Sequence, residues 1–181
     1  MKKTILSFFI ATISLFAFAQ KKTSTSATIA FDASTSIDAL PKAENKTAVA
    51  AIDPAKNTVQ FEASIKNFTF SNPRIQEHFN QEGWLNSDKF PKATFSGVIK
   101  DPSSVNFKKD GTYNVTVEGD LSIKGKTNKV TAPATIVVAG NTLKTDATFN
   151  IKLVDFGIEG QAINAGKVSA EPKITVSAEL N

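Results

Sequence analysis

The chain has 181 residues, a formal net charge of +4, 41% hydrophobic residues and no cysteine. This length suits one domain, and the lack of cysteine excludes disulfides, thiol catalysis and Cys-ligated zinc. The 21 Lys and Arg residues are scattered among 17 acidic ones and form no basic stripe, so we expect no nucleic-acid partner.

The N-terminus has the pattern of a secretory signal peptide. Lys2 and Lys3 precede an apolar run over 5–16, which ends at a small-x-small site over 17–19. The run is too short for a membrane span, so we expect cleavage after Ala19, no transmembrane anchor in the mature chain, and a periplasmic or secreted location. The polar residues 20–26 are predicted to be a flexible leader, followed by one domain over 27–181.

Hydrophobic and polar residues then alternate along most of the chain, which is the period of half-buried β-strands. Val59, Phe61, Ala63 and Ile65, for example, share one face of such a run. In chain order, the expected strands lie at about 27–32, 47–53, 59–66, 94–100, 113–123, 130–138, 143–153 and 174–180. Short polar turns join most of them, so the fold class is all-β and antiparallel, as a sandwich or a closed barrel.

The segment 72–95 departs from this period. It contains the only Trp, the only His and the only Arg of the chain, at Trp84, His78 and Arg74. A short helix is predicted over 72–80, because Asn72 suits the N-cap and Pro73 the first helical position. So much apolar surface in one connector must be buried against the domain.

The sequence offers little support for an enzymatic site. One histidine and no cysteine exclude multi-His and Cys/His metal sites, and no G-x-S-x-G turn or phosphate-binding loop occurs. Glu118, Asp120, Asp155 and Glu159 fall on polar faces or turns, where solvated carboxylates are expected. We therefore predict no enzyme, no metal site and no cofactor.

The two rare polar groups of the connector each have two interpretations. His78 either meets a polar ligand group or tethers the connector through a hydrogen bond to backbone. Arg74 either clamps a phosphate or carboxylate, or pairs with Glu77 or Glu82 on the surface. Likewise, the many Phe residues indicate either a close-packed core or the lining of a ligand cavity.

Four segments resemble one protein family. They are Asn72-x-Arg74-x-x-x-His78-Phe79, Trp84-Leu85 leading to Lys89-Phe90-Pro91-x-Ala93-Thr94-Phe95, Gly119-x-Leu121-Ser122-Ile123-Lys124-Gly125-x-Thr127, and Asp155-Phe156-Gly157-Ile158. In this order they resemble the YceI-like, polyisoprenoid-binding family of exported bacterial proteins, from about residue 27 to 180. Where that family carries an Arg before the Asp-Phe-Gly step, this chain has Lys152-Leu153-Val154.

The resemblance implies an eight-stranded antiparallel barrel like that of lipocalins, with an isoprenoid chain in its interior and no catalysis. Our hypothesis is therefore an exported protein that sequesters or carries an isoprenoid-type lipid, such as a polyprenyl phosphate or a quinone. One alternative is a fully packed structural or stress-response barrel. A second is a His78-dependent enzyme that acts on a bound lipid. Edge strands in related barrels also suggest a homodimer.

The residues expected to contact this ligand are mostly apolar. The predicted apolar pocket comprises Phe61, Ile65, Phe68, Phe70, Phe79, Trp84, Phe90, Phe95, Leu121, Ile123, Phe149, Phe156 and Ile158. The residues predicted to meet a polar head group are Arg74 and His78.

Overall fold

The computed structural model describes residues 20–181, so the predicted signal peptide at 1–19 lies outside the described residues. The strands are β1 (Lys22–Asp32), β2 (Lys42–Asp53), β3 (Thr58–Ser64), β4 (Thr69–Phe70), β5 (Lys92–Ile99), β6 (Gly111–Ile123), β7 (Lys126–Ala139), β8 (Thr142–Asn150) and β9 (Lys173–Leu180). The helices are α1 (Pro73–Asn80) and α2 (Gln161–Asn164), with 3₁₀ turns η1 (Ile65–Asn67), η2 (Pro102–Ser104) and η3 (Leu153–Phe156). No helix within 20–181 is long and apolar enough to span a bilayer.

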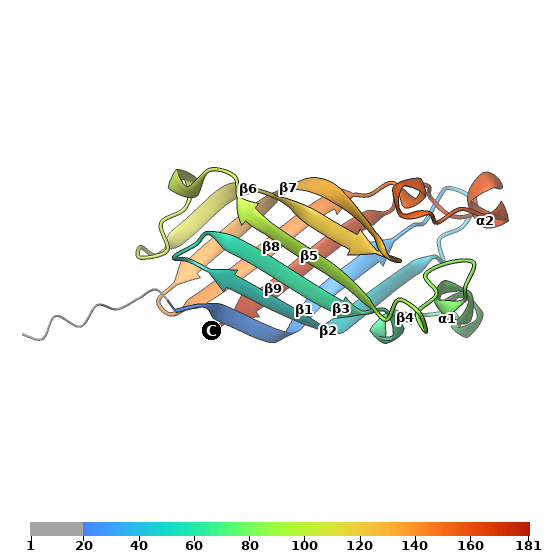
Figure 1. Cartoon of the computed structure of the whole chain (residues 1–181), viewed down its shortest axis with the longest axis horizontal. Coiled ribbons are helices and arrows are strands. Elements are labelled where there is room, and N and C mark those ends of the chain that lie inside the picture. The colour runs from blue at the N-terminus through green and yellow to red at the C-terminus, as the bar shows by residue number, and fades with distance from the viewer. Residues whose placement is uncertain (1–19) are drawn as a thin grey trace, which may run out of the picture.

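The strands close into an antiparallel barrel (Figure 1). Their order is β1-β9-β8-β7-β6-β5-β3-β2, and β1 also pairs with β2, which completes the ring. The two-residue strand β4 attaches to the N-terminal part of β2, where Phe70 opposes Ala43. The predicted all-β, eight-stranded barrel is thereby confirmed. Because the ring is closed, each of the eight long strands is paired on both sides. The expectation of a homodimer rested on exposed edge strands, and this argument does not apply to a closed ring.

Two sequence-based boundaries at the N-terminal side differ from the structure. The flexible leader predicted over 20–26 is wrong, because β1 begins at Lys22 and pairs with the end of β2. Thr23 and Asn181 also exchange backbone hydrogen bonds of 3.2 and 3.1 Å. Strand β2 begins at Lys42, five residues earlier than about 47. In both segments, backbone pairing with neighbouring strands decides the structure, although the side chains are largely polar.

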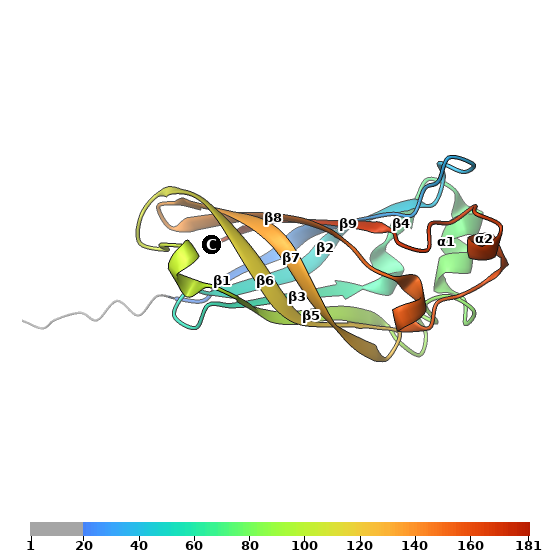
Figure 2. The same ribbon diagram turned by 90° about the horizontal axis from the view of Figure 1, so that it is seen from above.

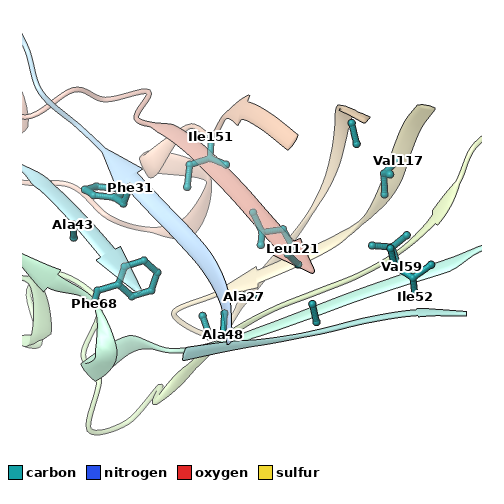
Figure 3. Close-up of a cluster of buried hydrophobic side chains, with 14 of the residues drawn as sticks. Ala27, Phe31, Ala43, Ala48, Ile52, Val59, Phe68, Val117, Leu121 and Ile151 are labelled. Atoms are coloured by element: carbon teal, nitrogen blue, oxygen red, sulfur yellow. The ribbon is translucent and has the colours of Figure 1, made fainter. Parts of the chain in front are cut away.

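The two ends of the barrel differ (Figure 2). One end, called the helix end, carries the 33–41 loop, α1 and α2; the other, called the turn end, carries the β2–β3 and β7–β8 turns and η2. Figure 3 shows Phe31 and Phe68 toward the helix end and Ile52 and Val59 toward the turn end, all within the barrel.

The helix predicted over 72–80 is present as α1. The Asn72 side chain accepts a hydrogen bond of 2.9 Å from the Arg74 amide, and Pro73 occupies the first turn. Phe79 is the buried residue of α1 and packs against aromatic rings of the barrel end. A local capping signal therefore starts the helix, and one aromatic anchor fixes it across the barrel end.

Candidate ligand-binding cavity

The barrel contains an internal cavity of about 150 Å³. Of the described residues that line it, all are apolar except Thr94 and Thr145, and none is charged. The lining comprises Ile29, Phe31, Val59, Phe61, Ala63, Ile65, Phe68, Phe79, Trp84, Leu85, Ala93, Thr94, Phe95, Val117, Leu121, Ile123, Val130, Ala132, Ala134, Thr145, Ala147, Phe149, Ile151, Leu153, Ile158, Ile174 and Val176. Such a surface can hold hydrocarbon and offers almost nothing to a polar ligand.

The cavity exists because alanines face each other on neighbouring strands. Ala63 of β3 pairs with Ala93 of β5, and Ala134 of β7 pairs with Ala147 of β8. All four line the cavity. A pair of methyl groups leaves space that larger side chains would fill, so these positions keep the middle of the barrel and its helix end hollow.

The turn end, in contrast, is closed by large side chains. Leu143 of β8 lies between Val138 of β7 and Leu180 of β9, and all three are at most 3% exposed. Ile52 and Ile136 are buried as well, and none of these five residues lines the cavity. The interior is therefore packed around these five residues and hollow where the cavity lies, which contradicts the fully packed alternative.

A pair of glycines shapes one wall of the cavity. Gly97 of β5 lies opposite Gly119 of β6, and the ring of Phe95 lies over both. A β-carbon at Gly119 would stand 2.4 Å from the Gly97 Cα and 2.8 Å from the Phe95 Cζ. These glycines thus let the Phe95 ring lie along the wall instead of filling the interior.

A second cavity, of about 160 Å³, adjoins the first at the helix end and is called the vestibule. It lies between the 33–41 loop, α1 and the segment after α2, and its lining includes the polar residues Asp38, His78 and Lys167. Phe31, Phe79 and Trp84 line both cavities. A ligand that occupied both spaces would therefore have an apolar body and a polar end.

Phe79 forms part of the partition between the two cavities, together with Phe31 and Trp84. Its ring centroid lies 5.8 Å from those of Phe31 and Phe68, and 4.9 Å from that of Phe70, all in tilted geometry. Such aromatic pairs are individually weak, at about 0.5–1.5 kcal/mol each beyond the burial of their area. The partition is thus held by several modest contacts on a short helix, rather than by the strands themselves.

Ten of the thirteen residues predicted for the apolar pocket line the cavity. They are Phe61, Ile65, Phe68, Phe79, Trp84, Phe95, Leu121, Ile123, Phe149 and Ile158. The other three lie elsewhere: Phe70 lines the vestibule, Phe156 is buried in η3, and Phe90 packs over Gly125 of the β6–β7 turn. Hydrophobicity predicted burial correctly for Phe70 and Phe156, but it carried no information on which space each side chain faces.

The two predicted head-group residues are separated. His78 lines the vestibule, whereas Arg74 is exposed at the start of α1 and lines neither cavity. Lys167 and Asp38, which share the vestibule with His78, were not predicted. They lie in loops far from residue 78 in sequence, and no motif marks them.

The polar residues within 20–181 form no recognisable catalytic or metal site. The imidazole of His78 has no hydrogen-bond partner in this part of the chain, so the predicted backbone tether is not formed, and Arg74 pairs with neither Glu77 nor Glu82. No cluster of three metal-ligating side chains occurs among the described residues. Glu118 and Asp120 form surface ion pairs with Lys100 and Lys129 at 3.2 and 2.8 Å.

Fold and cavity together define a closed β-barrel with an apolar cavity in its interior. The sequence profile described as "YceI-like domain" matches residues 14–180, and the chain belongs to this family. It is 28% identical to protein YceI of Escherichia coli over 133 residues, which cover 70% of this chain and 64% of that protein.

Solved structures of similar proteins have the same fold. BcnA of Burkholderia cenocepacia aligns with a TM-score of 0.69 and 24% identity, over 86% of this chain and 96% of that one. A polyisoprenoid-binding domain from Saccharophagus degradans, implicated in plant cell wall breakdown, aligns with a TM-score of 0.73 and 10% identity, over 89% and 97%. At these identities the likeness supports the barrel architecture.

Proposed function

We propose that this protein binds an isoprenoid-type lipid, such as a polyprenyl phosphate or a quinone, inside the barrel and sequesters or carries it without chemical conversion. The observation that carries the proposal is the cavity inside the barrel, with its almost entirely aliphatic and aromatic lining. Membership of the YceI-like family supports lipid binding, and one structural relative is described as a polyisoprenoid-binding domain.

The energetics of such a ligand are favourable. Each buried methylene contributes about 0.8 kcal/mol, so an isoprenoid chain gains affinity without any directed polar contact. A cavity of about 150 Å³ holds a ligand about the size of benzene, so a longer chain also needs the vestibule. We therefore place the apolar end of the lipid between the alanine pairs, and its polar end in the vestibule near His78 and Lys167.

We also propose that the protein acts in the periplasm or outside the cell. The charged start and apolar run before Ala19 favour export. Strand β1 begins at Lys22, so cleavage after Ala19 would leave the barrel intact. Intact-mass measurement of the exported protein should show loss of residues 1–19; a full-length mass in that fraction would contradict the proposed cleavage.

Blocking the cavity tests the binding proposal. Ala147→Phe places a ring where two alanines now leave space, so we expect loss of geranylgeraniol binding by at least about tenfold with little change in fold. The only Trp of the chain, Trp84, lines both cavities and provides a fluorescence signal for the titration. Ala139→Phe is the control, because Ala139 is exposed at the end of β7 and should leave affinity unchanged.

Extraction of the purified protein with organic solvent, followed by mass spectrometry, identifies any lipid that it carries. Recovery of a prenyl lipid from the wild type, and not from Ala147→Phe, is the expected result. No recovered apolar compound, together with Trp84 emission that does not respond to geranylgeraniol or its phosphate, would overturn the proposal.

A further inference from the structure

The 33–41 loop at the helix end exposes two large apolar side chains. Ile37 is 69% exposed and Leu40 is 48% exposed, although both belong to residue types that are normally buried. Ile37 also lies beside Gly166, with its Cδ1 3.4 Å from where a β-carbon of that glycine would stand. The two side chains therefore stand at the rim of the vestibule, where the loop meets the segment after α2.

Hydrogen bonds within the loop hold these two side chains outward. The Thr35 hydroxyl accepts from the amides of Ile37 and Asp38 at 3.2 Å, and an Asp38 carboxylate oxygen accepts from the Leu40 amide at 2.8 Å. Asp38 and Pro41 line the vestibule. The same loop thus forms part of the vestibule wall and presents Ile37 and Leu40 to the outside.

We propose that Ile37 and Leu40 insert into the surface of a lipid bilayer, so that lipid passes between the membrane and the vestibule. This inference rests on the proposed function, because a prenyl lipid resides in a bilayer and is poorly soluble in water. The turn end is closed by packed side chains, which leaves the helix end as the side through which the cavity is reached. The exposed apolar pair lies at that side.

The surface fits a bilayer better than it fits a second copy of the chain. Two side chains provide far less than the roughly 800 Å² per partner that a stable protein interface buries. Asp38 is the only charged residue in the 33–41 loop, so the loop itself offers no basic group to anionic lipids. Insertion of two apolar side chains without further anchors gives weak, reversible attachment, which suits a carrier that must leave the membrane.

Flotation with phosphatidylcholine vesicles tests the inference. The double substitution Ile37→Ser/Leu40→Ser should lower vesicle binding by about tenfold, equivalent to about 1.4 kcal/mol. The matched control is Val49→Ser/Val98→Ser, which removes two valines of the outer barrel wall that are 44% and 47% exposed. This control should bind vesicles as the wild type does, and adding phosphatidylglycerol should change binding little.

Three outcomes would overturn the inference. They are equal binding by the wild type and the Ile37→Ser/Leu40→Ser variant, an equal loss in the Val49→Ser/Val98→Ser control, and binding that occurs only with phosphatidylglycerol. Ultracentrifugation tests a fourth outcome. A dimeric wild type together with a monomeric Ile37→Ser/Leu40→Ser variant would show that this surface serves self-association and would also overturn the inference.

Uptake of geranylgeraniol added from ethanol separates this inference from the proposed function. The Ile37→Ser/Leu40→Ser variant should bind it normally by Trp84 fluorescence, yet acquire it more slowly from vesicles. A wild type that binds vesicles through these residues but takes up no geranylgeraniol would refute only the proposed function. Normal uptake from ethanol without any vesicle binding would refute only the inference.

Discussion

At the scale of single residues, Asn45 is a fully buried polar side chain that supports the wall of the barrel. Its amide donates to the Ser64 carbonyl at 2.9 Å, and its carbonyl accepts from the amide and hydroxyl of Thr47 at 2.8 and 3.0 Å. Between Ala27 and Ile29 of β1, the β1–β2 register shifts by one extra residue in β2. At this irregular point regular strand pairing is interrupted, and the hydrogen bonds of Asn45 stabilise it instead.

Replacing Asn45 by Ala should lower the free energy of unfolding by about 2 kcal/mol, because the substitution leaves buried polar groups unpaired. Urea unfolding measures the change. Asn67→Ala is the control: Asn67 is exposed and donates to the Thr47 hydroxyl at 2.7 Å, in the same network. Its loss should cost under about 1 kcal/mol. Equal costs at the two positions would show that burial of Asn45 is unimportant.

At the scale of elements, α1 is a short helix whose one buried side chain is Phe79. Phe79→Ala should destabilise the protein by about 3 kcal/mol, because it removes a buried ring and joins the cavity to the vestibule. Amide exchange in α1 should accelerate by more than exchange in β6 and β7, since the helix has few other buried contacts.

Asn72→Ala is the control, because it weakens α1 but leaves the Phe79 side chain in place. Loss of the cap should cost about 1 kcal/mol and leave geranylgeraniol affinity close to that of the wild type. Phe79→Ala should instead change the affinity or the rate of uptake. Identical binding kinetics in the two variants would argue against Phe79 as part of the partition.

At the scale of the whole molecule, the packed and hollow parts of the interior should contribute differently to stability and binding. Val115 and Val117 lie on the same strand, β6, and are 5% and 7% exposed, but Val117 lines the cavity and Val115 does not. Val115→Ala should cost about 2 kcal/mol of stability and Val117→Ala about 1, because a side chain beside an empty space has fewer packing contacts to lose.

Ligand binding should show the reverse order. Val117→Ala should change geranylgeraniol affinity several-fold, whereas Val115→Ala should leave it unaltered; thermal unfolding and Trp84 titrations measure the two effects. Larger destabilisation at Val117 than at Val115 would contradict the division of the interior into a packed and a hollow part.

Local sequence patterns predicted the elements well where the determining contacts are themselves local. Alternation of apolar and polar residues identified the strands, and the Asn72-Pro73 pair identified the start of α1. The same logic failed for Lys22–Ser26 and Lys42–Lys46, whose side chains are mostly polar. Their strand conformation depends on pairing with segments distant in sequence, and a local pattern of residues does not contain that information.

The candidate site was predictable in part for a related reason. Inward-facing positions follow from the strand period, so most of the predicted lining residues do face the interior. Hydrophobicity does not distinguish Phe61, which lies beside the cavity, from Phe156, which is buried in η3 away from it. It also gave no sign of Lys167, which the segment after α2 brings into the same vestibule as His78.

The amino-acid sequence by itself therefore determined an antiparallel all-β chain with one short helix, because these features depend on residues a few positions apart. Whether the barrel is hollow was decided by the tertiary structure. Closure and register set Ala63 against Ala93 and Ala134 against Ala147, and they place Leu143 beside Leu180 at the other end. Since a shift of one residue would turn every side chain to the opposite face, the cavity is a property of the register.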